Sequence, residues 1–293
     1  MLGAPMAKIA DGRLAAAVSE AGGLGLLGGG YGDPDWISRE MAVAGQVDGA
    51  EIGIGLITWN MSSDAVAIAL SHAPKAIWLS FGPVTPHAKA IKESRTTLIC
   101  QVASVSEATE AAEAGADVIV AQGSESGGHG RSNRALFGLL PAVVAAVDPI
   151  PVVAAGGVTS REGLDAAVAL GAAGVALGTA LYATEEAADI SAAKARLVAS
   201  GGDDTVRSVV YDIARGPEWP SGYSGRSLRT NLTDRWIGHE DEMRDQAEQI
   251  RADHVQATTG ADMTVRVVWA GEGIDGIDAI RPVAEVVRQF PLC

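Results

Sequence analysis

The stretch AEAGADVIVAQGSESGGHG, residues 112–130, contains a helix end, an apolar run and a polar loop in direct succession. Gly115 stands where a helix should stop, and residues 117–122 form a mostly apolar run. This order predicts a helix followed by a strand that is buried on both faces, as in a parallel sheet covered by helices. The loop after the strand places His129 between glycines, either as a functional group or as an incidental histidine of a mobile surface loop.

Similar apolar runs alternate with helix-like segments from the start of the chain to about residue 200. The other predicted strands are residues 2–5, 24–28, 52–57, 76–80, 97–102, 151–155 and 174–178. N-cap signals predict three of the helix starts: Asp33 before Pro34, Ser104 three residues before Glu107, and Thr159 three residues before Glu162. Eight such repeats predict an α/β fold, a TIM (β/α)8 barrel over residues 1–200, with a doubly wound open sheet as the alternative.

The alternation of apolar runs with helix-like segments ends at about residue 200. The segment PEWPSGYSGRSLRTNLTDRW, residues 217–236, has prolines, glycines and aromatic residues without a period. Helices are predicted over 239–258 and about 275–290, so residues 201–293 are interpreted as a C-terminal cap on one end of the barrel. An uncharged stretch, 166–184, is long enough for a membrane helix, but its glycines favour a helix end, a turn and a short strand.

The composition restricts the partners. A formal net charge of -14 opposes binding to nucleic acid or to an anionic membrane, since both need clustered lysine and arginine. Cys100 and Cys293 provide neither a disulfide framework nor the spacing of a metal site. The N-terminus lacks the pattern of a signal peptide, so a cytoplasmic protein acting on a small molecule is expected. The composition leaves open whether the protein forms a homo-oligomer.

An apparent nucleotide fingerprint near the N-terminus does not fit its context. Gly23, Gly25 and Gly28 spell GxGxxG, but the predicted strand lies inside this pattern instead of before it. A Rossmann-type dinucleotide site is therefore not expected.

Two glycine motifs follow the last two predicted strands: AAGGVTS at 154–160 and ALGTA at 176–180. Barrel enzymes frequently bind phosphate in these loops, where backbone N–H groups can approach an anion closely. Such a site needs little positive charge, which suits an acidic chain. Gly156, Gly157 and Gly178 could instead serve only tight turns.

The loop of His129 should open on the same face as these motifs, because it also follows a barrel strand. An imidazole there could exchange a proton with a bound ligand near neutral pH. Gln122, the last residue of the strand, offers an amide donor and an acceptor to a ligand ring, or is a satisfied polar residue at the barrel end.

The sequence resembles the nitronate monooxygenase family, formerly called 2-nitropropane dioxygenases, whose members are FMN-containing barrels. The resemblance covers most of the chain. It depends on APMA at 4–7, SEAGGLGLLGGGYG at 19–32, the stretch 112–130, the PVVAAGGV and ALGTA pair, and the pattern WPxxYxxRxLRTN at 219–231.

The resemblance implies an FMN site and an active-site histidine, His129. It places the isoalloxazine near Ala4, Pro5, Met6, Gln122, Gly127 and Gly128, and the phosphate on Gly156, Gly157, Gly178 and Thr179. The implied activity is the oxidation of alkyl nitronates, such as propionate 3-nitronate, with molecular oxygen. His129 would take the α-proton of the substrate or hold the nitronate.

Other activities are compatible with the same motifs. Many members of the family carry an asparagine after the third strand, where this chain has Thr58 and Trp59. The scaffold and its GGH loop also occur in FMN-dependent enoyl-ACP and NADH:quinone reductases, so an NAD(P)H-fed reductase is the main alternative. A flavin-free phosphate-binding isomerase or lyase and a non-catalytic flavin carrier are two further classes.

Overall fold

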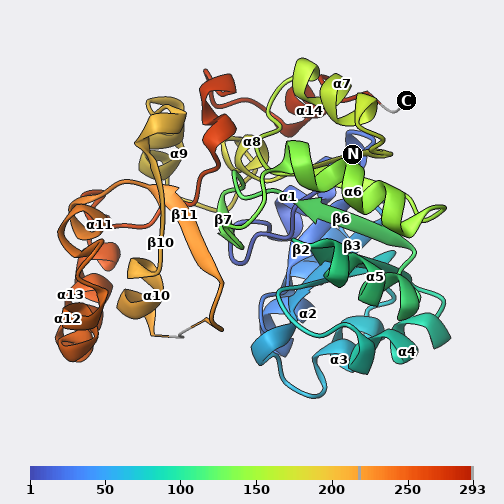
Figure 1. Ribbon diagram of the computed structural model, residues 1–293, viewed down its shortest axis with the longest axis horizontal. Coiled ribbons are helices and arrows are strands. Elements are labelled where there is room, and N and C mark those ends of the chain that lie inside the picture. Colours follow the sequence, from blue (N-terminus) through green and yellow to red (C-terminus); the bar gives the residue numbers. More distant parts are fainter. Residues whose placement is uncertain (217–218, 292–293) are drawn as a thin grey trace.

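A parallel eight-stranded sheet forms the centre of the molecule (Figure 1), and the computed structural model describes residues 1–216 and 219–291. The strands run in the order β1-β9-β8-β6-β5-β4-β3-β2, and a bridge between Leu2 and Leu24 closes the two ends. Their bounds are Leu2–Gly3 (β1), Gly25–Gly28 (β2), Ile52–Ile57 (β3), Ala76–Ser80 (β4), Thr97–Val102 (β5), Val118–Gln122 (β6), Val152–Ala155 (β8) and Gly174–Leu177 (β9). The predicted TIM barrel is confirmed, and the open sheet is wrong.

Helices alternate with these strands and cover the outside of the barrel. They are α1 Gly12–Glu20, α2 Pro34–Ala44, α3 Ala65–Ser71, α4 Thr85–Glu93, α5 Val105–Glu113, α6 Leu136–Val147, α7 Arg161–Ala169, α8 Thr179–Tyr182 and α9 Ser191–Val198, with a short 3-10 helix at Thr58–Asn60. The uncharged stretch 166–184 forms the end of α7, strand β9 and helix α8, so the membrane-helix alternative is wrong. No helix within the described ranges is long and apolar enough to cross a membrane.

Two of the three predicted N-caps are confirmed. The Asp33 carboxylate accepts a hydrogen bond from the backbone N–H of Trp36 at 3.1 Å, and the Ser104 hydroxyl accepts one from Glu107 at 3.1 Å. The prediction for Thr159 is wrong, because the next residue, Ser160, caps α7. The Thr159 hydroxyl instead donates to the backbone oxygen of Gly273 at 2.6 Å, which ties this turn to the C-terminal part of the chain.

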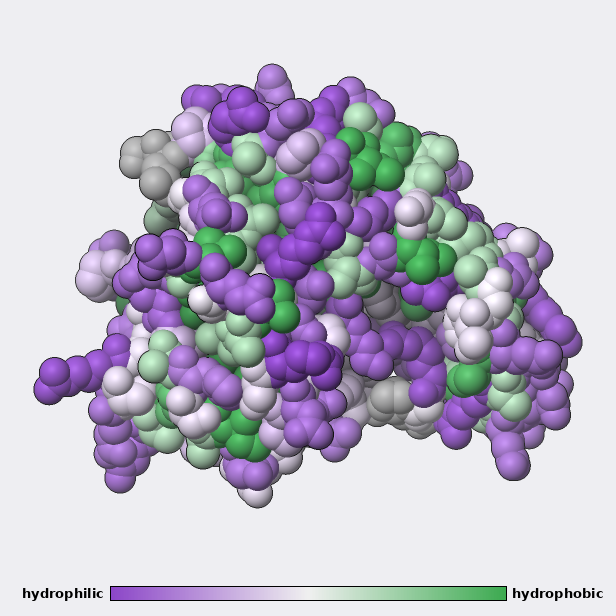
Figure 2. Space-filling view, turned by 180° about the vertical axis from the view of Figure 1, so that it is seen from behind, coloured by the Kyte–Doolittle hydropathy of each residue, from purple (hydrophilic) through white to green (hydrophobic). Residues whose placement is uncertain are grey.

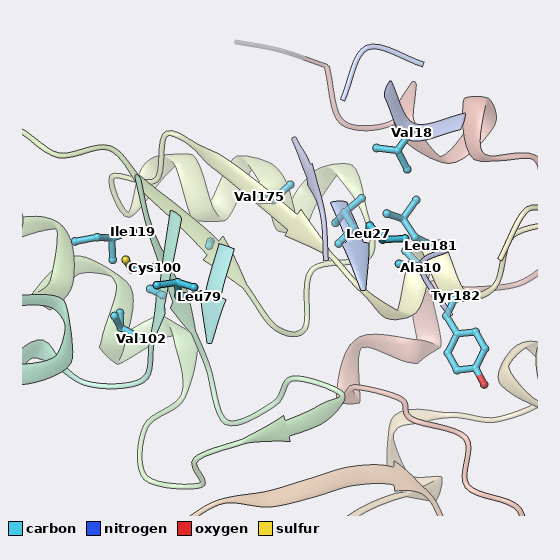
Figure 3. Packing of buried hydrophobic residues seen from close by; sticks show 14 of the residues in the cluster. Ala10, Val18, Leu27, Leu79, Cys100, Val102, Ile119, Val175, Leu181 and Tyr182 are labelled. Carbon is cyan, nitrogen blue, oxygen red and sulfur yellow. The ribbon is translucent and has the colours of Figure 1, made fainter. Parts of the chain in front are cut away.

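Side chains alternate along the strands between the inside of the barrel and the helices, and both sets are buried. Leu26, Trp78, Ile99, Val120, Val153 and Ala176 belong to the inner cluster. Figure 3 shows part of the larger outer cluster, in which Leu79, Cys100, Val102 and Ile119 lie together. Period-two burial on both faces is what a helix-covered parallel barrel requires, and it explains the continuous apolar runs in the sequence.

The tail, residues 201–293, is joined to the barrel by a second sheet that the sequence did not predict. Strand β10 (Thr205–Ser208) pairs with β11 (Ser224–Leu228), and β11 pairs in turn with β7 (Gly128–Gly130), the segment that contains His129. The remaining tail elements are η2 Gly202–Asp204, α10 Val210–Arg215, α11 Asn231–Trp236, α12 Glu240–Asp245, α13 Ala247–Thr259, η3 Glu272–Gly276 and α14 Val283–Val287.

The predicted tail helices are corrected in two places. The segment 239–258 is helical but divides into α12 and α13 at Gln246. The predicted helix over about 275–290 is wrong in its first half, since α14 begins only at Val283. Pro282 stands at its N-cap, and a proline further inside a helix would remove a backbone hydrogen bond.

Candidate functional site

A cavity of about 330 Å³ opens at the carboxyl ends of the barrel strands and is lined by residues of both the barrel and the tail. In the space-filling view the surface is hollowed between the two parts (Figure 2). Every residue predicted for the site lines this cavity: Ala4, Pro5, Met6, Gln122, Gly127, Gly128, His129, Gly156, Gly157, Gly178 and Thr179. The barrel topology thus brings five separate segments of the sequence to one place.

The glycines after β8 and β9 form one end of the cavity. Gly156 and Gly157 have φ angles of 106° and 70°, which side chains rarely adopt. Gly178 differs, because its φ is -107° and an added Cβ would meet only Ala4 and Met6, at 3.7 and 3.9 Å. Neither backbone conformation nor packing against the protein demands a glycine there. A ligand that approaches the backbone of Gly178 would account for it.

The tail completes this end with glycines of its own. A Cβ on Gly273 would lie 2.3 Å from the Gly157 oxygen, and one on Gly127 would lie 2.6 Å from the Gly271 nitrogen. The backbone N–H of Gly271 donates to the Thr179 hydroxyl at 3.0 Å, so that hydroxyl keeps its own proton for another acceptor. We call residues 156–157, 178–179, 271 and 273 the glycine cradle.

A chain of hydrogen bonds crosses the strand ends beneath the cavity. The Trp78 indole donates to the Ser80 hydroxyl at 2.8 Å, and the Gln101 amide donates to the Gln122 oxygen at 3.0 Å. The Gln122 amide then donates to the backbone oxygen of His129 at 3.1 Å. Gln122 is thus held in a fixed orientation with one amide N–H still available, as a residue that contacts a ligand ring would need.

His129 itself is held by two side chains of the tail. Its Nε2 lies 2.7 Å from Oδ1 of Asp212 on α10, and the two side chains are only 12% and 6% exposed. The Trp219 indole stacks on the imidazole with ring centroids 3.7 Å apart and an angle of 7° between the planes. An incidental histidine on a mobile surface loop would have neither contact, so that interpretation is wrong.

Aromatic side chains surround the histidine. Tyr31, Phe81, Trp219 and Trp269 line the cavity, and Trp59 packs behind them with its ring centroid 5.5 Å from Tyr31 and 5.4 Å from Trp219. Burial, followed by the negative charge of Asp212, raises the pKa of Tyr31. Its hydroxyl therefore stays protonated at neutral pH and can donate a hydrogen bond into the cavity.

Thr58 and Trp59 stand at the position where many family members have asparagine, and neither lines the cavity. The buried Thr58 hydroxyl donates to the Ser80 oxygen at 3.2 Å, whereas Trp59 supports the aromatic wall.

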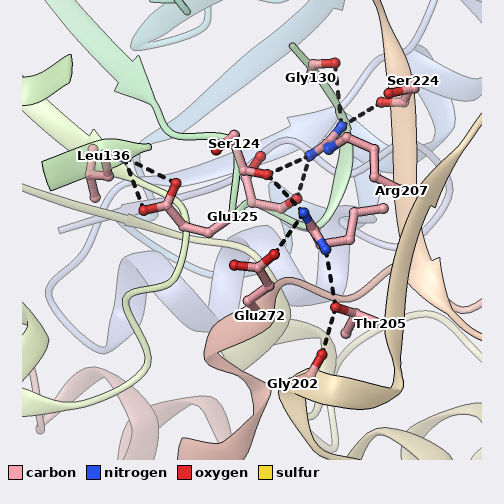
Figure 4. A network of polar contacts seen from close by, with 11 residues as sticks. Ser124, Glu125, Gly130, Leu136, Gly202, Thr205, Arg207, Ser224 and Glu272 are labelled. Atoms are coloured by element: carbon pink, nitrogen blue, oxygen red, sulfur yellow. Dashed lines mark hydrogen bonds and ion pairs between the residues drawn. The ribbon is translucent and has the colours of Figure 1, made fainter. Parts of the chain in front are cut away.

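Two partly buried arginines of the tail contact the loop between β6 and β7 (Figure 4). Arg207 donates to the backbone oxygens of Ser124, Ser126, Gly130 and Ser224 at 2.6 to 3.3 Å. Arg226 pairs with Glu272 at 2.7 Å. Burial, followed by the charge of Arg226, lowers the pKa of Arg207 to about 10, so it remains a cation at neutral pH.

Sequence reasoning missed the tail residues of the site. Asp212, Arg215, Trp269, Gly271 and Gly273 all line the cavity, but they lie in segments without a recognisable period. Of the tail tryptophans, Trp236 is buried and packs in the cluster around α10, whereas Trp219 lines the cavity.

Comparison with known proteins identifies the family. A family model described as nitronate monooxygenase matches residues 1–61 and 51–292. The chain belongs to the nitronate monooxygenase family. The nitronate monooxygenase npaC of Metarhizium robertsii is 37% identical over 269 residues, which cover 82% of this chain and 74% of that protein. A nitronate monooxygenase of Neurospora crassa is 30% identical and covers 99% of this chain, with 87% of its own length matched.

Solved structures with the same fold include FabK and a nitroalkane oxidase. FabK from Thermotoga maritima superposes with a TM-score of 0.87 at 32% identity, covering 99% of this chain and 90% of FabK. A nitroalkane oxidase from Streptomyces ansochromogenes superposes with a TM-score of 0.83 at 25% identity, covering 98% of this chain and 93% of the oxidase. This member of the nitronate monooxygenase family is therefore an oxidoreductase with the same barrel fold as these structures.

Proposed function

We propose that the protein oxidises alkyl nitronates, such as propionate 3-nitronate, with molecular oxygen and with FMN as its cofactor. The observation that carries this proposal is the single cavity in which the glycine cradle and the anchored His129 occur together. One part of the cavity is suited to an anion, and the other presents a titratable ring to a small apolar substrate.

The cradle fits a single phosphate group such as that of FMN. Gly156, Gly157, Gly178 and Thr179 would hold the phosphate through backbone N–H groups and one hydroxyl, without a cationic side chain in the cradle. The unexplained glycine at 178 is the specific sign of a close ligand, because the protein alone leaves room for a Cβ there. The ring would lie along Ala4, Pro5, Met6, Gln122, Gly127 and Gly128, with the oriented Gln122 amide available as a donor.

The chemistry divides between the cofactor and the chain. When bound, FMN supplies an acceptor for electrons from the substrate and a site of reaction with oxygen. His129 holds a proton next to the nitronate or takes one from its conjugate acid, and the aromatic wall excludes water from the reacting atoms. The protonated Tyr31 can donate a hydrogen bond to the charged oxygens of a nitronate.

The tail acts as a cap in this proposal, with residues 1–200 as the FMN-binding barrel and 201–293 as the cap. Its support is that β11 extends the sheet of the His129 loop, and that Asp212, Trp269 and Gly271 line the same cavity as the barrel residues. A barrel without these residues would lack one wall of its site.

The second candidate is an FMN-dependent reductase fed by NAD(P)H, with a quinone or an enoyl thioester as acceptor. The likeness to FabK favours it. The exposed Arg215 at the cavity lining is a suitable contact for the phosphates of a nucleotide or of a thioester carrier.

Anaerobic mixing of the holoprotein with propionate 3-nitronate, NADH or NADPH separates the two candidates. The proposed function predicts that the nitronate bleaches the flavin absorbance within the turnover time and that NADH and NADPH bleach it far more slowly. Rapid bleaching by either nucleotide, with no effect of the nitronate, would reject the oxidation and support the reductase. Release of the bound flavin and its mass determine whether it is FMN.

A further inference from the structure

The carboxylate of Asp212 is buried against His129 and is only partly satisfied. Its Oδ1 accepts from His129 Nε2 at 2.7 Å, whereas its Oδ2 is buried and has no hydrogen-bond partner among the described residues. A buried carboxylate is costly unless it is paired with a positive charge or with strong donors. A proton taken up by the imidazole would place a cation directly beside this carboxylate.

The contact also fixes which ring nitrogen is free. A carboxylate that accepts from Nε2 holds the tautomer with the proton on Nε2 and leaves the lone pair on Nδ1. Within the described residues Asp212 alone hydrogen-bonds the ring of His129. Nδ1 is thus the nitrogen available to take a proton from a molecule in the cavity.

Trp219 supports the same charge change. Its indole lies parallel to the imidazole at 3.7 Å, and the face of an indole attracts a cation. The imidazolium formed by proton uptake would have a carboxylate at its edge and an indole on its face. Both groups come from the tail, and both lie against the ring of His129.

A purely structural role for Asp212 is poorly supported, because the backbone around His129 is already held without it. Strand β11 pairs with β7 with Gly225 opposite His129, and Arg207 donates to the adjacent Gly130 oxygen. The Gln122 amide donates to the backbone oxygen of His129 itself. What Asp212 adds is contact with the ring.

We propose that Asp212 is the positioning residue that makes His129 a base toward neutral nitroalkanes, a role that rests on the proposed function of the site. In the step, the Cα–H bond of the nitroalkane breaks and its proton goes to Nδ1 of His129. The electron pair stays on the substrate as the nitronate anion. The histidine–aspartate pair changes from a net charge of -1 to zero, so proton uptake removes the unpaired buried charge.

Exchange of the substrate's α-protons measures this step without electron transfer. Holoenzyme under anaerobic conditions is mixed with nitroethane in D2O, and loss of the CH2 signal is followed by proton NMR. The wild type is expected to exchange faster than buffer, and Asp212→Asn is expected to lower the enzymatic exchange rate by about a hundredfold or more, the scale of a general base held in the wrong tautomer. Oxidation of preformed ethyl nitronate should fall at least tenfold less than exchange does.

Two variants complete the design. Asp234→Asn changes a tail aspartate that is 56% exposed and pairs with Arg229, and its exchange rate should match the wild type. Asp212→Glu keeps the carboxylate and should retain a higher exchange rate than Asp212→Asn. This order should hold even when both variants bind less flavin than the wild type. Equal losses in the glutamate and asparagine variants, or equal losses of exchange and of nitronate oxidation, would overturn the role.

The wild type alone separates this inference from the proposed function. Nitronate oxidation without exchange above buffer would overturn the base role and leave the proposed function standing. Exchange above buffer without nitronate oxidation would overturn the proposed function and leave the base role of His129 standing.

Discussion

The barrel and the tail contribute different things to one site. The barrel provides backbone: the glycines that follow β8 and β9 and the end of β6 are brought together by the pairing of these strands. The tail provides side chains that act on His129, namely Asp212 and Trp219, and the arginine that holds its loop. Cofactor binding thus depends mainly on backbone of the barrel, and the orientation of His129 depends on side chains of the tail, so variants in the two parts should fail in different ways.

Removal of the tail should have the largest effect, because it should impair folding, flavin binding and turnover together. A chain truncated after residue 200 loses the β10–β11 sheet and the tail side chains Val268, Ala270 and Ile274, and so exposes barrel residues of the main core cluster in which these side chains pack. We expect insoluble protein or protein without flavin. Soluble expression, the flavin absorbance and turnover are the measurements, and a soluble, yellow and equally active barrel would contradict the cap.

Gly178→Asp should abolish cofactor binding by the barrel without affecting the tail. The carboxylate would occupy the cradle and repel the phosphate, so we expect flavin retention to be abolished while the fold persists. Gly157→Asp should do the same, although its φ of 70° adds strain. Gly138→Asp is the matched control, since a Cβ there meets nothing within 4 Å. Full flavin occupancy after purification of both cradle variants would remove the phosphate assignment.

Arg207→Met tests how strongly the tail holds the His129 loop. The change removes hydrogen bonds to four backbone oxygens, two of them in the loop at Ser124 and Ser126, and only the Ser124 oxygen keeps a second donor, Arg226 at 3.3 Å, among these two. We expect a loss of roughly 3 kcal/mol in the free energy of unfolding by urea, together with faster flavin release. Arg229→Met removes a half-exposed arginine paired with Asp234 and should cost less than about 1 kcal/mol. Similar losses in both variants would deny Arg207 a special role.

The smallest expected effect concerns the pH dependence of the stability that His254 in the tail contributes. Burial, followed by Arg215 and Arg266, lowers the pKa of His254 on α13. Below the ordinary histidine pKa the unfolded chain therefore binds a proton that the folded chain refuses, so stability falls as the pH decreases from neutral toward 5. His254→Gln should flatten this decline in urea titrations. An unchanged pH profile would show that the decline comes from other groups.

The barrel could be predicted from sequence because its signals are local. Each strand is a short apolar run, and Asp33 and Ser104 cap helices within three residues of themselves. The barrel residues of the cradle and His129 follow from their positions after strands. The Thr159 prediction failed because α7 begins one residue later with Ser160 as its N-cap, while the Thr159 hydroxyl contacts the distant Gly273.

The tail could not be predicted in the same way. Strand β11 is SGRSL, which has neither an apolar run nor a clear alternation, and it forms because β7 and β10 lie on either side of it. Asp212 is one of many acidic residues in the sequence, and its contact with His129 spans 83 positions. Such contacts depend on tertiary placement that no local pattern encodes.

The most direct test of the account compares two forms of one substrate in His129→Asn. A neutral nitroalkane must lose its α-proton before oxidation, whereas its preformed nitronate has already lost it. If His129 takes this proton, turnover of the nitroalkane should fall by roughly a hundredfold or more and turnover of the nitronate much less. Equal losses on the two forms would assign His129 to binding of the anion, and unchanged rates on both would contradict its place at the centre of the site.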